Sequence, residues 1–176
     1  DGEAVRLLCV AAHSASEVGV FHYLRAQGSI FGDNELYVGL AIGDKTFCVY
    51  VNVLSEKEQE TLVKNLERKG LVLIGFNIKA LLHAWQKLHP HAIHFFDCEL
   101  AEYLLHAGRE VLLSEIMYSY AGVSLDETRA ATHPQEFVGN VARQLLAIYP
   151  VLVAAIAAKK QETVLANIEN PTLPVL

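Results

Sequence analysis

The sequence predicts an α/β fold in which helices flank a mixed five-stranded sheet and a helical part completes the chain. Two observations support this prediction. Five short apolar or β-rich runs lie before residue 97, and helix signals separate the later ones. After residue 111 only helical patterns occur. Strands that come first and then alternate with helices are typical of a layered α/β domain.

The first three predicted strands precede the first strong helix signal. Residues 5–11 form a continuous apolar run, which is typical of a central strand covered on both faces. Residues 36–42 and 46–53 are rich in β-branched and aromatic side chains and are joined by a Gly-Asp-Lys turn. These two runs therefore predict an antiparallel hairpin.

Helices and strands alternate in the middle of the chain. Ser55 followed by Glu58 predicts a helix start with an N-cap and a capping box. Asp97 predicts a second N-cap, and Pro150 suits the first turn of a last helix. The predicted elements after the first helix are strands over residues 71–76 and 93–96 and helices over residues 77–88, 97–106, 112–121, 134–148 and 150–167.

Composition narrows the possible functions. A formal net charge of −6 argues against a free-standing nucleic-acid binder, because phosphate contacts need clustered Lys and Arg. The three cysteines are far apart and lie in apolar runs, which indicates buried free thiols and an intracellular protein. The apolar residues 145–158 fall short of the roughly 20 residues of a membrane span, so we expect a core helix and no membrane partner.

Four segments resemble a known family when they are taken in order. Residues 37–53 carry the hairpin, residues 75–79 read Gly-Phe-Asn-Ile-Lys, and residues 96–105 read Phe-Asp-Cys-Glu-Leu-Ala-Glu-Tyr-Leu-Leu. Their order and spacing are similar to the 3′-5′ exonuclease domain, of ribonuclease-H-like fold, of family A DNA polymerases of the bacterial DNA polymerase I type. Residues 167–176 resemble the segment that leads into the polymerase domain, which favours this family over ribonuclease-D-type relatives.

The resemblance implies a domain organisation and partners. Residues 1–168 would form an exonuclease-like domain, and residues 169–176 would begin the connection to a polymerase domain outside this sequence. Because the chain begins at Asp1 and its one methionine is Met117, we expect a piece of a longer protein. The implied partners are the polymerase domain of the same parent chain and, through the parent, DNA. The implied location is the bacterial cytoplasm, and we expect the piece alone to be monomeric.

The family's exonuclease chemistry needs carboxylates that this sequence lacks. Two divalent ions, roughly 4 Å apart, hydrolyse the phosphodiester, and hard magnesium ions need oxygen ligands. In the first motif, an acid-x-acid at the end of the first strand, the matching residues are Ala11 and His13. The acid of the second motif matches Leu81, and the Tyr and Asp of the third match Phe137 and Val141. We therefore expect no catalytic residue, metal or cofactor in this domain, and Mg²⁺ only in the absent polymerase domain.

Three functions stay open at this point. The first is a catalytically inactive exonuclease-fold domain with a structural role in a DNA polymerase I that acts in replication or repair. The second is an active ribonuclease-D-like 3′-5′ exonuclease with displaced acids, for which Asp97, Glu99 and Glu136 are the candidates. The third is a nucleic-acid or partner-binding module, which a basic surface stripe would support; its cations would be Arg6, Arg25, Lys45, Lys64, Arg68 and Lys69.

The histidine-rich segment is a further candidate metal site. His89, His91 and His94 lie within six residues, and three imidazoles can hold a transition metal. Pro90 and the position between a helix and a strand favour an exposed loop instead. We expect no metal there.

Overall fold

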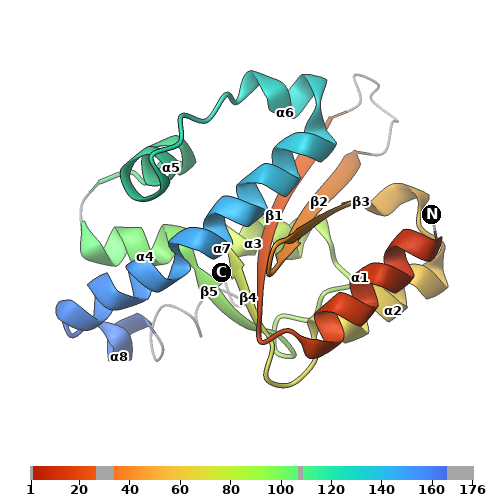
Figure 1. The fold of residues 1–176 in the computed structure, drawn as a ribbon, viewed down its shortest axis with the longest axis horizontal. Coiled ribbons are helices and arrows are strands. Elements are labelled where there is room, and N and C mark those ends of the chain that lie inside the picture. Colours follow the sequence, from red (N-terminus) through yellow and green to blue (C-terminus); the bar gives the residue numbers. More distant parts are fainter. Residues whose placement is uncertain (1, 27–33, 107–108, 166–176) are drawn as a thin grey trace.

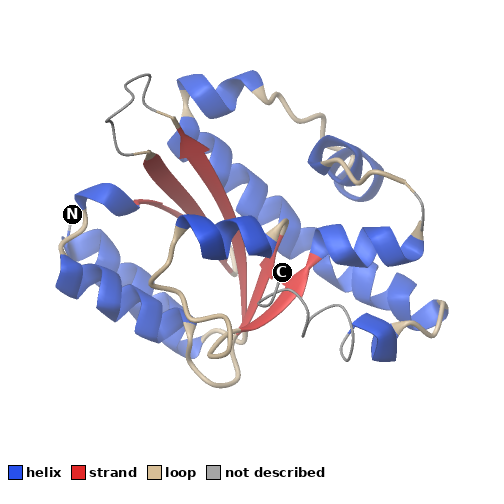
Figure 2. Ribbon diagram, turned by 180° about the vertical axis from the view of Figure 1, so that it is seen from behind, coloured by secondary structure: helices blue, strands red, loops and turns tan. Residues whose placement is uncertain are grey.

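A computed structural model describes residues 2–26, 34–106 and 109–165 of the chain. Within these residues one five-stranded sheet lies between two layers of helices (Figures 1 and 2). The end of the helix predicted over residues 150–167 and the predicted connection over residues 169–176 lie outside the described residues.

The sheet is mixed, as predicted. It has the strand order β3-β2-β1-β4-β5. The hairpin strands β2 and β3 are antiparallel, and β1 is antiparallel to β2 but parallel to β4, which is in turn parallel to β5. The strands are β1 (Glu17–Arg25), β2 (Glu35–Ile42), β3 (Lys45–Tyr50), β4 (Val72–Gly75) and β5 (His94–Asp97).

The prediction of a first strand over residues 5–11 is wrong, because these residues lie in a helix, α1 (Gly2–Ser14). Val5, Leu8 and Ala12 are buried and recur at helical spacing, a period that the apolar residues between them conceal in the sequence. The first strand is instead β1, which follows α1 directly.

The remaining predicted helices form with changed boundaries. The N-cap and capping box of Ser55 and Glu58 are confirmed at the start of α2. A short 3-10 helix, η1 (Val51–Val53), and a short helix before the last long one were not predicted. The helices are α2 (Glu56–Leu66), α3 (Ile78–Ala84), α4 (Cys98–Leu105), α5 (Leu113–Ala121), α6 (Thr128–Thr132), α7 (Pro134–Ala158) and α8 (Glu162–Val164).

The two helices predicted to meet at Pro150 are a single helix, α7. An interior proline costs a helix about 3 kcal/mol, because it removes one hydrogen bond and crowds the preceding turn. Ile148, Leu152 and Ile156 are each no more than 2% exposed and anchor the helix on both sides of the proline. Burial of the flanking turns therefore outweighs the local preference for a break.

Different helices cover the two faces of the sheet. Helices α1, α2 and α3 share one hydrophobic cluster with one face, and α4, α5 and α7 share a second cluster with the other face. Figure 2 shows α3 in front of the sheet and α7 behind it. Although α7 is long and apolar enough to cross a membrane by length and composition, it packs along β1, β2 and β3, in keeping with the expected core helix.

The cysteines only partly follow the prediction. All three are free, as predicted. Only Cys98 is buried, whereas Cys9 is half-buried and Cys48 is exposed. The prediction of burial is wrong for Cys48 because this residue lies on β3, which is at the edge of the sheet.

Helix α7 approaches the sheet at backbone distance through two glycines. A Cβ atom on Gly19 of β1 would lie 2.2 Å from the carbonyl oxygen of Ala142, and one on Gly39 of β2 would lie 2.1 Å from that of Val138. No side chain fits in this space. The absence of two Cβ atoms therefore determines how closely α7 can pack against the centre of the sheet.

We expect Gly39→Ala to destabilise the protein by at least about 3 kcal/mol, because the new methyl group would push α7 away from β2. Gly43→Ala is the control. Its Cβ would meet nothing within 4 Å, so only the left-handed backbone (φ 59°) adds a cost, of about 1 kcal/mol. Urea unfolding of the three proteins measures both effects, and equal losses would contradict the close packing.

Candidate functional site

The second half of β1 and the start of α7 meet through aromatic side chains. Phe21 lies on the face of β1 that α7 covers, two residues after Gly19. Its ring centroid is 6.1 Å from that of Phe137, with an edge-to-face angle of 70°. Tyr23 is the next residue on this face and packs against the same cluster. An apolar contact therefore joins the strand to the helix.

A hydrogen-bonded network continues from this contact towards the end of β1. Arg25 forms an ion pair with Glu35, and its guanidinium carbon lies 5.6 Å from the ring centroid of Tyr37. The hydroxyl groups of Tyr37 and Tyr50 both donate to the Glu35 carboxylate at 3.2 Å. Their rings stack with centroids 4.8 Å apart. The Glu35 carboxylate is thus bound by one cation and two phenols.

The structure brings together the residues of only one of the three matched motifs. Phe137 and Val141 are buried on α7 and line one cavity of about 260 Å³, together with residues of α5 and of the segment before α6. Leu81 is 1% exposed and packs in the hydrophobic cluster on the opposite face of the sheet. Ala11 and His13 lie in the last turn of α1, on that same opposite side.

The match of Ala11 and His13 to a strand end was based on a wrong strand assignment, because these residues are helical. Phe21 and Tyr23 lie on β1, the first strand of the chain. They are two residues apart, as the two acids of the first motif are, and they face α7. The sequence contained a signal for this strand, since residues 17–25 are rich in β-branched and aromatic side chains and come before the hairpin.

Among the described residues, Asp97 alone carries a charged side chain that is buried, with 1% of its surface exposed. Its carboxylate accepts backbone N–H groups of Ile78 at 2.7 Å, of Asn77 at 3.2 Å and of Glu99 at 2.9 Å. The predicted N-cap of α4 is therefore confirmed, and the same side chain also binds the start of α3. Burial raises the pKa of this carboxyl, and the amide hydrogen bonds oppose the rise.

The remaining candidate ligands are dispersed. The Nδ1 atom of His89 lies 2.8 Å from Glu67, whose carboxylate also accepts the His89 backbone N–H at 2.7 Å. Burial, followed by the nearby Asp97 charge, raises the pKa of Glu99. Within residues 2–26, 34–106 and 109–165, no three His, Cys, Asp or Glu side chains gather as metal ligands would.

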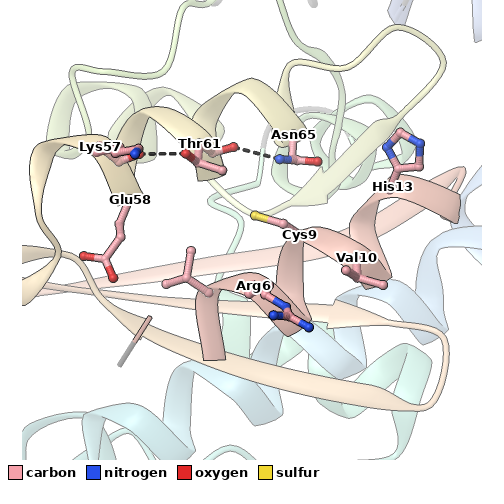
Figure 3. A pocket seen from close by; sticks show the side chains of 9 residues that line it. Arg6, Cys9, Val10, His13, Lys57, Glu58, Thr61 and Asn65 are labelled. Atoms are coloured by element: carbon pink, nitrogen blue, oxygen red, sulfur yellow. Dashed lines mark hydrogen bonds between the residues drawn. The ribbon is translucent and has the colours of Figure 1, made fainter. Parts of the chain in front are cut away.

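A groove of about 530 Å³ lies between α1 and α2, on the face of the sheet opposite α7 (Figure 3). Val5, Cys9 and Val10 are among its apolar lining residues, and Arg6 and Lys57 are among the polar ones. Burial raises the pKa of the Cys9 thiol, which disfavours the reactive thiolate. The groove therefore contains neither an activated nucleophile nor an acid pair.

Comparison with known proteins gives matches in structure alone. No family model and no curated protein matches the chain. The POL domain of Pol1 from M. smegmatis, in complex with DNA primer-template and dNTP, is similar with a TM-score of 0.77 and 19% identity over 98% of this chain. The fold is ribonuclease-H-like, of the exonuclease type. This chain spans only 29% of that polymerase chain.

Two nucleases show the same fold. A mutant catalytic core of RRP6 from Trypanosoma brucei matches with a TM-score of 0.80 and 14% identity, over 100% of this chain and 51% of its own. NrnC from Brucella melitensis with bound Mg²⁺ matches with a TM-score of 0.67 and 18% identity, over 93% of this chain and 84% of its own. The chain is therefore structurally similar to 3′-5′ exonuclease domains at low sequence identity.

We expect Asp97→Asn to destabilise the protein by about 2 to 4 kcal/mol, because an amide NH₂ would face backbone N–H groups that the carboxylate now accepts. Asp126→Asn serves as the control, since Asp126 caps the exposed start of α6 through Thr128 and its loss should cost much less. Thermal unfolding of both variants tests this, and equal melting temperatures would contradict a structural role for Asp97.

The imidazole of His22 predicts a pH dependence of stability. His22 lies on β1, and burial lowers its pKa from 6.5 to about 4. The unfolded chain therefore binds this proton more readily, so the stabilisation is complete above pH 6.5 and is lost as the pH falls towards 4. We expect the wild-type protein to lose about 2 kcal/mol more than His22→Gln between pH 7 and pH 5.

Urea unfolding at pH 7, 6 and 5 measures this difference. The exposed His133→Gln variant controls for the removal of a surface imidazole. Parallel pH profiles for the wild-type and His22→Gln proteins would show that His22 is not buried in its neutral form.

Proposed function

We propose that this chain is a 3′-5′ exonuclease-fold domain without nuclease activity, which has a structural role in a DNA polymerase of the DNA polymerase I type. The observation that carries the proposal is the aromatic contact between Phe21 and Phe137. Two divalent ions, roughly 4 Å apart, need several carboxylate ligands. Where the resemblance implies such ligands on the first strand and the last long helix, this chain has Phe21, Tyr23, Phe137 and Val141.

Two acids that lie within the fold already have hydrogen-bond or ion-pair partners there. Glu35 binds Arg25, Tyr37 and Tyr50, and Asp97 accepts backbone N–H groups at the starts of two helices. Either carboxylate would have to give up these partners to bind a metal ion. This supports an inactive domain over a nuclease with displaced acids.

The polymerase parent is supported by the order of the elements and by the likeness to Pol1 over 98% of this chain. In this proposal residues 1–168 form the domain, and residues 169–176 begin the connection to the polymerase domain. DNA binds through the parent chain, Mg²⁺ belongs to the polymerase domain, and the parent acts in replication or repair in the bacterial cytoplasm.

Two of the six cations considered for a binding stripe are engaged inside the fold. Arg25 pairs with Glu35, and the Arg68 guanidinium donates to the carbonyl groups of Ala12 and Ala15. Together with the net charge of −6, this supports a structural role over direct nucleic-acid binding.

We expect the purified chain to release no nucleotides from 5′-labelled single-stranded DNA or RNA in Mg²⁺ or Mn²⁺, because within the described residues no three His, Cys, Asp or Glu side chains gather as metal ligands would. Titration calorimetry with Mn²⁺ should likewise show no binding heat. An active 3′-5′ exonuclease domain with its carboxylates intact, assayed alongside, checks that the substrates and ions support cleavage.

Variants identify the source of any cleavage. Glu99→Gln and Glu136→Gln remove displaced-acid candidates, and Glu115→Gln on the exposed surface of α5 is their control. Cleavage that is lost in Glu99→Gln or Glu136→Gln but retained in Glu115→Gln would refute the inactive domain and establish a displaced-acid nuclease.

A further inference from the structure

The solvent-facing side of α7 changes character halfway along the helix. In the first half it carries the exposed polar residues Gln135, Glu136, Asn140 and Arg143. From residue 144 to residue 158 the helix has no charged side chain. The exposed residues of this second half are all apolar, and we call them the apolar face: Ala147, Pro150, Val151, Val153, Ala154, Ala157 and Ala158.

The core does not account for the apolar face. Leu145, Ile148, Leu152 and Ile156, each no more than 2% exposed, already fill the side of the helix that faces the second hydrophobic cluster. Val151 and Val153 point away from it, with 48% and 39% of their surface exposed. Single exposed apolar residues are common, but a run without any charge along four helical turns is typical of a surface that another element covers.

The size of the side chains indicates what covers it. Helices that lie in a membrane surface insert large residues such as Trp, Phe and Leu, whereas alanine supplies four of the seven side chains here. Small side chains instead let the axis of a second helix approach closely. A protein helix therefore fits the apolar face better than a lipid surface does.

The charges at the two ends of the apolar face indicate which kind of helix packs on it. Arg143 precedes the apolar face and Lys160 follows it, and both are exposed. In a dimer of this chain, cations would face cations whether the two α7 helices ran parallel or antiparallel. A partner helix with small apolar side chains between carboxylates would meet opposite charges at both ends.

We propose that the apolar face of α7 is the docking surface for a helix of the polymerase module of the parent chain, one that carries carboxylates at both ends of the contact. This inference rests on the proposed function. Its support is the apolar face itself and the fact that the Pol1 chain extends far beyond the 29% that this chain matches. Docking there would place the contact with the polymerase module on the C-terminal half of α7, whereas Phe137 lies near its N-terminal end.

The test measures binding between residues 1–176 and the separately expressed polymerase module of the parent chain, by titration calorimetry. Val151→Glu and Ala154→Glu place a carboxylate in the middle of the apolar face while keeping a good helix former. We expect each to weaken binding by about tenfold or more. The matched control is Asn140→Glu, an exposed position on the polar half of the same helix, which should bind as the wild type does.

The outcomes separate this inference from the function on which it rests. Tight binding that is unchanged by Val151→Glu and Ala154→Glu would overturn the docking surface and leave the structural role intact. Two results would overturn both the docking surface and the structural role. One is a parent chain without a polymerase module. The other is a polymerase module that does not bind residues 1–176 and is equally stable when these residues are deleted from the parent chain.

Two further measurements address the other occupants. Sedimentation that shows a dimer of residues 1–176, lost in Ala154→Glu, would assign the apolar face to a second copy and overturn the proposal. Flotation with vesicles of phosphatidylglycerol and phosphatidylcholine, lost in the same variant, would assign it to a membrane and overturn it equally. Circular dichroism of each variant confirms that α7 is folded.

Discussion

The contact between the backbone of α7 and the centre of the sheet determines the arrangement of the rest of the molecule. Because Gly19 and Gly39 have no side chains, the helix lies directly on β1 and β2. This position brings Phe137 onto Phe21 and carries the second half of the helix towards α4. The same contact therefore closes the candidate site and presents the apolar face.

Much of the fold could be predicted because its signals are local. The hairpin, the capping box of Ser55 and the cap at Asp97 each depend on a few adjacent residues, and all three are present. The first strand and Pro150 were misjudged for the opposite reason. Whether residues 5–11 are helical, and whether α7 continues through its proline, depends on burial against elements distant in sequence.

The candidate site was less predictable than the fold. The proximity of Phe137 and Val141 could be predicted because they are one turn apart on a single helix, and they line one cavity. Phe21 and Tyr23 were not predicted, since aromatic side chains carry no catalytic signature in the sequence, and their place beside α7 depends on the pairing of β1 with β2 and β4. The second role of Asp97, at the start of α3, depends on another non-local pairing, that of β4 with β5.

The aromatic residues are divided between the two layers of the molecule. The one tryptophan of the chain, Trp85, is 2% exposed in the cluster formed with α1, α2 and α3, and its indole N–H has no acceptor within the described part of the chain. Tyr23, Tyr37, Tyr50, Tyr120 and Tyr149 all belong to the other cluster. Tryptophan fluorescence and tyrosine absorbance consequently record the loosening of opposite halves, so a denaturation experiment can tell whether the two sides of the sheet come apart together or in sequence.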